Sequence, residues 1–193
     1  MFALKERERS GQGQFVEAAL HDCGLSLLHP HSANHLLDAR IVPGRSGNAH
    51  PNICPYDTFA TGSTPIFLAA GNDGQFGKLC ELIGAPELAS DPRIVTNPQR
   101  NAHREVLKPP LEAKLAPFED CDALADRLVR AGVPCAPIHD VPAALGDAHT
   151  AHRGMVVGIG EEYRGVASPI KLSRTPATYR LVPPRGRGKT GAA

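Results

Sequence analysis

The sequence has no excess of charge of either sign, because 21 lysine and arginine residues face 20 aspartate and glutamate residues. This balance excludes a protein that binds nucleic acid or a membrane surface through bulk charge. Apolar runs such as residues 66–70 are far shorter than the roughly 20 residues that a membrane-spanning helix needs. Residues 1–9 are charged and no apolar stretch follows them, which is unlike a secretory signal. We therefore expect a cytoplasmic protein without a nucleic-acid or membrane partner.

The five cysteines are odd in number and show no C-x-x-C spacing. This usage is typical of a reducing cytosol and argues against a disulfide framework or a zinc site. Serine lacks the Ser-x-Gly spacing of a nucleophile elbow, so covalent catalysis by serine or cysteine has no support. Glycine (19) and proline (18) are frequent, which predicts many turns and linkers, while 41% hydrophobic residues suffice for a core.

Apolar periodicity predicts helices over residues 14–28 and 120–131, and a third helix that follows residues 71–74 and ends at Gly84. Another helix between residues 101 and 115 must break or restart at Pro109 and Pro110. Residues 56–60 and 65–70 are predicted to form a β-hairpin. Residues 155–159 and 166–172 are predicted as late strands. Residues 29–55 have the composition of a linker or loop, and the tail beyond residue 182 is predicted to be disordered.

Two short glycine motifs and several histidines are weak candidates for binding sites. Residues 11–14 resemble half of a dinucleotide fingerprint but lack its third glycine and its preceding strand. Residues 188–190 resemble the end of a P-loop without the first glycine, so this motif is rejected. The clustered histidines are His29, His31, His35, His149 and His152. They are better explained as solvated or locally hydrogen-bonded side chains than as metal ligands, and we expect no metal.

Asn72 and Asp73 stand directly before the helix that ends at Gly84. One interpretation is an N-terminal cap, in which a side-chain oxygen accepts hydrogen bonds from unpaired backbone N–H groups. The other is a carboxylate beside backbone donors, facing a cleft. The two interpretations are compatible.

A series of eight motifs resembles family III CoA-transferases, also called the CaiB/BaiF family. The motifs lie in the family's order at residues 10–17, 47–51, 55–59, 70–76, 91–97, 131–138, 153–156 and 168–173, and the similarity covers about residues 6–184. The resemblance implies part of an α/β fold, with one helix of a large domain, a linker, a small α+β domain and return strands. The implied boundaries are residues 1–30, 31–45, 46–146 and 147–182, followed by the tail 183–193.

The resemblance also implies a reaction in which CoA moves between an acyl-CoA and a carboxylic acid, with CoA as substrate rather than resident cofactor. In the family an aspartate attacks the thioester and then carries the CoA as its own thioester, which is covalent catalysis. That aspartate is expected upstream of Met1, because Asp22 and Asp73 do not match its position. We therefore expect a chain truncated at both ends, without a catalytic residue and inactive alone. Full-length members form homodimers.

Two loops are expected to contact substrate. Their residues are Gly47, Asn48 and His50 in the first loop and Gly71, Asn72, Asp73 and Gln75 in the second. In the related α-methylacyl-CoA racemases a glutamate takes the place of Asp73, so aspartate favours the transferase. A racemase or epimerase relative remains an alternative, as does a non-catalytic binding or assembly fragment.

Overall fold

The computed structural model describes residues 1–161 and 163–183 of the chain. By its internal contacts the chain divides into two units, Met1–Ala136 and Pro137–Ala193. The domain boundaries expected from the resemblance stay a prediction. The predicted disorder of the tail concerns residues that, apart from residue 183, lie outside the described ranges. Of the helices within those ranges, none combines the length and the apolar character that a bilayer crossing requires.

A small sheet lies at the centre of the first unit. Its strands, in hydrogen-bonded order, are β1 (Tyr56–Phe59), β2 (Ile66–Ala69) and β3 (Cys135–Pro137). β1 and β2 are antiparallel and place Phe59 opposite Ile66, which confirms the predicted hairpin. Ile66 and Leu68 are fully buried because side chains two residues apart face the same side of a strand.

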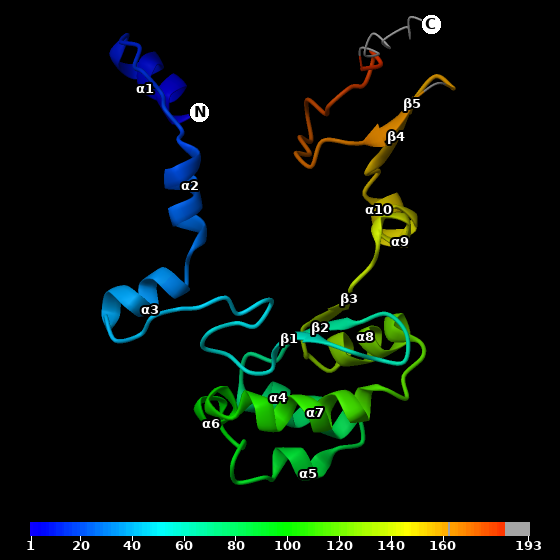
Figure 1. Ribbon diagram of the computed structural model, residues 1–193. Coiled ribbons are helices and arrows are strands. Elements are labelled where there is room, and N and C mark those ends of the chain that lie inside the picture. The colour runs from blue at the N-terminus through cyan, green and yellow to red at the C-terminus, as the bar shows by residue number, and fades with distance from the viewer. Residues whose placement is uncertain (162, 184–193) are drawn as a thin grey trace, which may run out of the picture. The chain divides into compact units, whose positions relative to one another are not determined.

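Five helices pack together beside this sheet (Figure 1). They are α4 (Asp73–Leu82), α5 (Pro86–Ala89), α6 (Asn97–Ala102), α7 (Arg104–Leu115) and α8 (Cys121–Arg130). α4 packs against α5 and α8, and α7 packs against β1 and α6. Their shared core includes Phe76, Leu79, Leu107, Leu111, Leu115, Leu124 and Leu128. Burying each such side chain contributes roughly 1.5–3 kcal/mol, so this core is the main source of the unit's stability.

Helices α4 and α8 confirm the predictions from apolar periodicity and end signals. The N–H of Ala123 donates to the Asp120 carboxylate at 2.9 Å, which caps the start of α8. Gly84 and Gly132 follow the ends of α4 and α8 with φ of 70° and 83°. Only glycine adopts this left-handed conformation at little cost, and it satisfies carbonyl groups at a helix end.

The prediction that Pro109 and Pro110 interrupt a helix is wrong. Helix α7 runs through both prolines from Arg104 to Leu115. Leu107, Leu111 and Leu115 lie at four-residue spacing and are buried in the core. Burial of this stripe offsets the roughly 3 kcal/mol that each proline costs inside a helix. The helix expected from residue 101 is divided instead, because α6 ends at Ala102 and α7 begins at Arg104.

Three helices precede the sheet: α1 (Phe2–Ser10), α2 (Leu20–Leu27) and α3 (His31–Leu37). The helix predicted from residue 14 begins only at Leu20. Phe15 and Val16, 87% and 70% exposed, pack against little, and Ala19 provides no capping side chain. Helix α3 lies in the predicted linker, and its seven residues are too few to show a clear periodic pattern.

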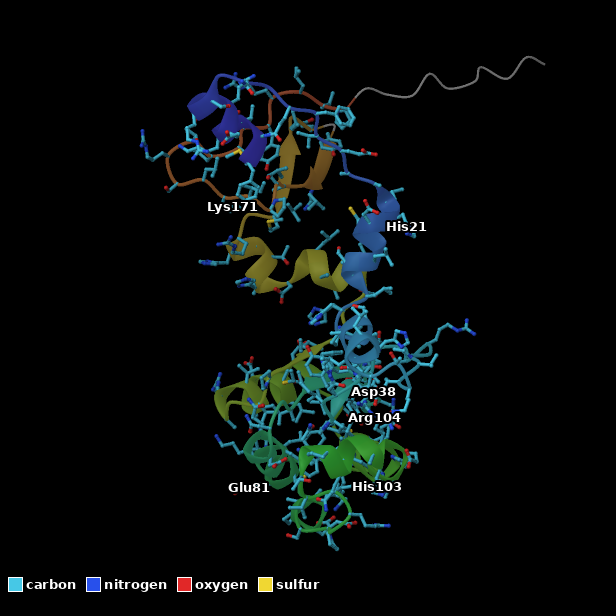
Figure 2. All side chains as sticks on the ribbon, turned by 90° about the vertical axis from the view of Figure 1, so that its left-hand side faces the viewer. His21, Asp38, Glu81, His103, Arg104 and Lys171 are labelled. Carbon is cyan, nitrogen blue, oxygen red and sulfur yellow. The ribbon has the colours of Figure 1, made fainter. Side chains whose placement is uncertain are left out.

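The apolar side chains of α2 are exposed. Leu20 and Leu27 are 91% and 81% exposed. Figure 2 shows side chains crowded around Arg104 in the helical core and sparse around His21 on α2. An apolar face of this kind is available to a packing partner.

Within its described residues, 137–161 and 163–183, the second unit contains two short helices and a two-stranded antiparallel sheet. Its elements are α9 (Val141–Gly146), α10 (Ala148–His152), β4 (Val156–Ile159) and β5 (Tyr163–Val166). The prediction for β4 is confirmed, but the strand predicted over residues 166–172 ends at Val166. Val166 pairs with Val156, and Pro169 cannot donate a backbone hydrogen bond to extend the ladder.

Replacing Pro109 by alanine should stabilise the chain. Pro109 is exposed, so the substitution restores a backbone donor inside α7 without changing the core. We expect the free energy of unfolding to rise by about 1–3 kcal/mol, measured by urea denaturation followed by circular dichroism. The matched control is Ala113→Pro on the same helix, which should lower stability. An unchanged or lower midpoint for Pro109→Ala would contradict the account of α7.

Candidate functional site

The second candidate loop, residues 71–75, is the turn that joins β2 to α4. The Asn72 side chain accepts a hydrogen bond from the Gln75 N–H at 2.9 Å, which confirms the cap interpretation. The Gln75 side chain accepts from the Gly71 N–H at 2.7 Å and donates to the Gly132 carbonyl at 3.1 Å. Hydrogen bonds within the loop therefore stabilise its conformation, and a further one attaches it to Gly132, just beyond the end of α8.

The Asp73 carboxylate is engaged by two groups of α6. Its Oδ1 accepts from the backbone N–H of Asn97 at 2.8 Å and from the Arg100 guanidinium at 2.6 Å. The Asp73 side chain is 56% exposed, whereas the side chain of Arg100 is fully buried. Asp73 thus anchors the start of α4 to α6, and one face of its carboxylate remains open to solvent.

Arg100 is the buried cation that joins three backbone segments. Its Nε donates to the Cys54 carbonyl at 2.7 Å, and one terminal nitrogen donates to the Val95 and Ile94 carbonyls at 2.7 and 3.2 Å. The guanidinium carbon also lies 4.3 Å from the centre of the Phe76 ring, a cation–π contact. A buried charge is tolerated only when it is paired and hydrogen-bonded in this way.

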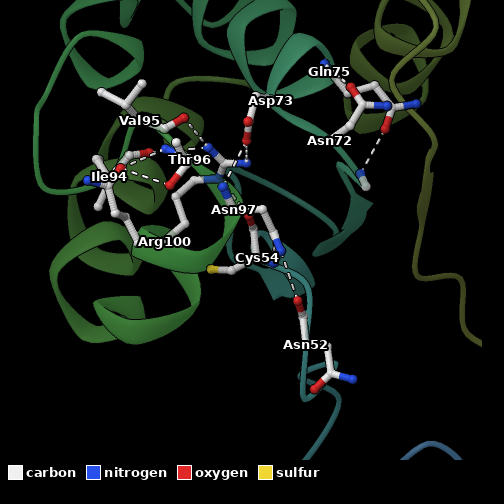
Figure 3. Close-up of polar contacts among 12 residues, drawn as sticks. Asn52, Cys54, Asn72, Asp73, Gln75, Ile94, Val95, Thr96, Asn97 and Arg100 are labelled. Atoms are coloured by element: carbon white, nitrogen blue, oxygen red, sulfur yellow. Dashed lines mark hydrogen bonds and ion pairs between the residues drawn. The ribbon is translucent and has the colours of Figure 1, made fainter.

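Asn97 connects the second loop to the segment that follows the first loop (Figure 3). Besides its backbone contact with Asp73, its side-chain oxygen accepts from the Cys54 N–H at 3.0 Å. Its side-chain nitrogen donates to the Asn52 carbonyl at 2.9 Å. The structure therefore joins the two predicted loops through α6, although they are 20 residues or more apart in the sequence.

The first candidate loop, residues 46–51, is held mainly at its C-terminal end. Gly47 adopts φ of 62°, which favours glycine, and Asn48 is exposed. The His50 carbonyl accepts a hydrogen bond from the Arg104 guanidinium, and the backbone N–H of His50 donates to the Tyr56 carbonyl at 2.9 Å. The His50 ring lies 5.0 Å from the Tyr56 ring.

The imidazole of His50 is held in its neutral form. Its Nδ1 accepts a hydrogen bond from the Asn52 N–H at 3.1 Å, so the ring proton of the neutral form resides on Nε2. Burial lowers the pKa of His50 below its ordinary value of 6.5, and the positive charges of Arg104 and His31 act in the same direction. The available Nε2–H is a hydrogen-bond donor near neutral pH.

A groove of about 610 Å³ lies beside His50. Its walls include Asn34, Arg45, Pro51 and Arg104. Within the described ranges Arg45 makes no hydrogen bond or ion pair, so its charge is available to an anion. The second loop does not line this groove. No group of three or more histidine, cysteine or acidic residues in the part of the chain that the structure describes is arranged to hold a metal ion.

The buried thiols are unsuited to nucleophilic catalysis because burial favours their protonated form. Burial raises the pKa of Cys54 and of Cys121, and it raises the pKa of Cys80 to about 12. The half-buried Cys135 has a pKa raised to about 11, again mainly by burial. These thiols stay protonated at neutral pH, whereas a nucleophilic cysteine requires the thiolate.

Sequence reasoning missed Arg100 and the role of Asn97. Asn97 is the last residue of one of the eight motifs, but the partners of its side chain lie more than 40 residues away in the sequence. Arg100 looks like one more surface cation in a polar stretch. The one sequence feature that could have indicated burial of Arg100 is its place between two apolar segments, and this feature is only weakly informative.

Comparison with known proteins identifies the family. The sequence model of CoA-transferase family III matches residues 1–189, and the chain belongs to this family. It is 35% identical over 187 residues to the succinate–glutarate CoA-transferase of Agrobacterium fabrum, covering 95% of this chain and 46% of that protein. It is 38% identical over 174 residues to the acetyl-CoA:oxalate CoA-transferase of Acetobacter aceti, covering 89% of this chain and 43% of that protein.

A crystal structure of a CaiB/BaiF family protein from Brucella suis has the same fold. It superposes with a TM-score of 0.75 at 37% identity and covers 94% of this chain and 47% of the other. The expected partial α/β fold of family III CoA-transferases is confirmed. The chain spans about half the length of the relatives that it matches.

Replacing Arg100 by methionine should strongly destabilise the first unit. Methionine keeps most of the volume but leaves the buried Cys54 carbonyl and the Val95 carbonyl without this donor and removes one of the two donors to the Asp73 carboxylate. We expect a loss of about 2–5 kcal/mol in urea denaturation, because each buried acceptor left unsatisfied costs roughly 1–3 kcal/mol. Arg93→Met is the matched control, because Arg93 also pairs with an aspartate, Asp91, at 2.7 Å but is 63% exposed. It should cost about 1 kcal/mol or less, and equal midpoints for the two variants would contradict the assigned role.

Protonation of His50 should loosen the first loop. The pKa of His50 in the folded chain lies below 6.5, so the unfolded chain binds this proton more tightly. The contribution of His50 to the free energy of unfolding therefore falls as the pH drops from about 6.5 through the pKa of the folded state. A protonated Nδ1 cannot accept from the Asn52 N–H, so the Asn52 amide resonance should shift over this range. His50→Gln should abolish the shift, and a shift retained in that variant would exclude His50 as its source.

Proposed function

We propose that this chain is part of an enzyme that transfers CoA between an acyl-CoA and a carboxylic acid. The match of the family III model along residues 1–189 is the observation that carries the proposal. The similarity to a succinate–glutarate and an acetyl-CoA:oxalate CoA-transferase supports small carboxylic acids as substrates. CoA acts here as a substrate, and the chemistry needs no metal.

The two loops are proposed to contact the acyl group and the acceptor acid. In the first loop, Gly47 and Asn48 form the exposed tip, and the neutral His50 offers an Nε2–H donor beside Arg45. A carboxylate or a thioester oxygen would accept such a hydrogen bond, and donors of this kind stabilise the oxyanions of acyl transfer. The groove whose walls include both His50 and Arg45 supports this assignment.

The second loop is proposed to contribute backbone shape and the open face of a carboxylate. Gly71, Asn72 and Gln75 hold the turn through their mutual hydrogen bonds. Asp73 is engaged by Arg100, which suits a positioning role better than attack on a thioester.

We further propose that the 193-residue chain alone does not transfer CoA. In the family the reaction proceeds through an aspartyl anhydride and an aspartyl thioester, and both steps require the nucleophilic carboxylate. Asp22 is exposed on α2 and Asp73 is bound to Arg100, and neither matches the nucleophile's position. The reacting aspartate, the cytoplasmic location and a homodimer are properties proposed for the complete enzyme.

The test compares the chain with a chimera. In the chimera, residues 1–189 replace the corresponding segment of the Agrobacterium fabrum relative, which supplies the other half of the fold. With succinyl-CoA and labelled glutarate, chromatography should detect CoA transfer by the chimera and none by the chain alone. Replacing the nucleophilic aspartate in the donor half provides the inactive control.

Three results would contradict the proposal. Efficient exchange by the isolated chain would refute its inactivity. A folded chimera that exchanges deuterium at the α-carbon of a branched acyl-CoA, without transferring CoA, would favour the racemase alternative. A folded chimera with neither activity would favour a non-catalytic fragment.

A further inference from the structure

The backbone N–H and carbonyl of Cys54 are both bound by side chains of one helix, α6. Its N–H donates to the side-chain oxygen of Asn97 at 3.0 Å, and its carbonyl accepts from Arg100 Nε at 2.7 Å. The same two residues of α6 donate to Asp73 Oδ1. Asn97 and Arg100 therefore each link the two candidate loops. On one side they contact the Asn52–Cys54 segment, which follows the first loop, and on the other side they contact Asp73 of the second loop.

Helix formation by itself does not explain the asparagine at position 97. The start of α6 is closed by Thr96 and Gln99, whose side-chain oxygen accepts from the Thr96 N–H at 3.0 Å and from the Thr96 hydroxyl at 2.9 Å. The Asn97 side chain takes no part in this cap. It donates to Asn52 and accepts from Cys54 instead, so its two polar groups serve contacts outside the helix.

We propose that Asn97 is a positioning residue that couples the two candidate substrate loops. Its side chain fixes the segment that leaves the first loop, while its backbone N–H fixes the aspartate of the second loop. An opening of either loop then disturbs the other through the first turn of α6. The coupling of the two loops does not depend on the proposed function. Only the statement that these loops contact substrate rests on it.

A matched control residue lies four positions further along α6. Asn101 is half-buried like Asn97, and its side-chain nitrogen donates to the Pro51 carbonyl at 3.0 Å. Its side-chain oxygen accepts from Arg104. Asn101 thus holds the first loop from the same helix but has no contact with the second loop.

The experiment measures amide hydrogen exchange by NMR on the chain without substrate. Asn97→Ala should accelerate exchange at Gly71 and Gln75, which its side chain does not contact, by about threefold to tenfold, the factor that corresponds to the loss of about one hydrogen bond. Amides of the core residues Leu111 and Leu128 should keep their wild-type rates, which separates local coupling from global destabilisation. Asn101→Ala should leave Gly71 and Gln75 unchanged.

Acceleration at Cys54 alone, with wild-type rates at Gly71 and Gln75, would overturn the proposal. An equal acceleration by Asn101→Ala would overturn it as well. If Asn97→Ala does not fold, Asn97→Asp keeps the acceptor for Cys54 and removes the donor to Asn52. This variant should also accelerate exchange at Gly71 and Gln75, and unchanged rates would refute the coupling. Because no substrate is present, a negative result is distinct from a failure of the proposed CoA transfer.

Discussion

The buried charge of Arg100 is the constraint on which the first unit depends. A guanidinium without water must direct its donors to acceptors that are held in place. Arg100 does so with carbonyls of Cys54, Ile94 and Val95 and with the Asp73 carboxylate. These acceptors belong to three separate segments, so the charge is satisfied only when the segments have assembled. The arginine therefore links the packing of the core to the shape of the loops at its edge.

This link determines what the candidate site can do. Asp73 neutralises Arg100 and anchors α4, and this engagement favours the positioning role proposed for it over that of a nucleophile. The neutral imidazole of His50 and Arg45, which makes no hydrogen bond or ion pair to the residues that the structure describes, are available to a carboxylate in the groove. Under the proposed function, such donors surround the acyl group, while an aspartate performs the covalent chemistry. The chain is thus proposed to position the substrate, and the reacting carboxylate is proposed to come from the other half of the fold.

The sequence predicted the elements whose signals are local. The hairpin, the helices α4 and α8 and the cap of α4 follow from residues close together in the chain. The break at Pro109 was wrong because a buried leucine stripe offset the local cost of proline. Arg100 was missed because its acceptors are up to 46 residues away, and no local pattern marks a cation that will be buried. The motifs located both loops, but their connection through Asn97 is a property of the folded chain.

The most direct test of this account is NMR of the arginine side chains. The account predicts a separate, slowly exchanging Nε–H resonance for Arg100, with a through-hydrogen-bond coupling to the Cys54 carbonyl. Arg45, which has no partner within the described ranges, should instead give a rapidly exchanging Nε–H. An Arg100 signal that exchanges as fast as that of Arg45 and shows no such coupling would contradict the central claim.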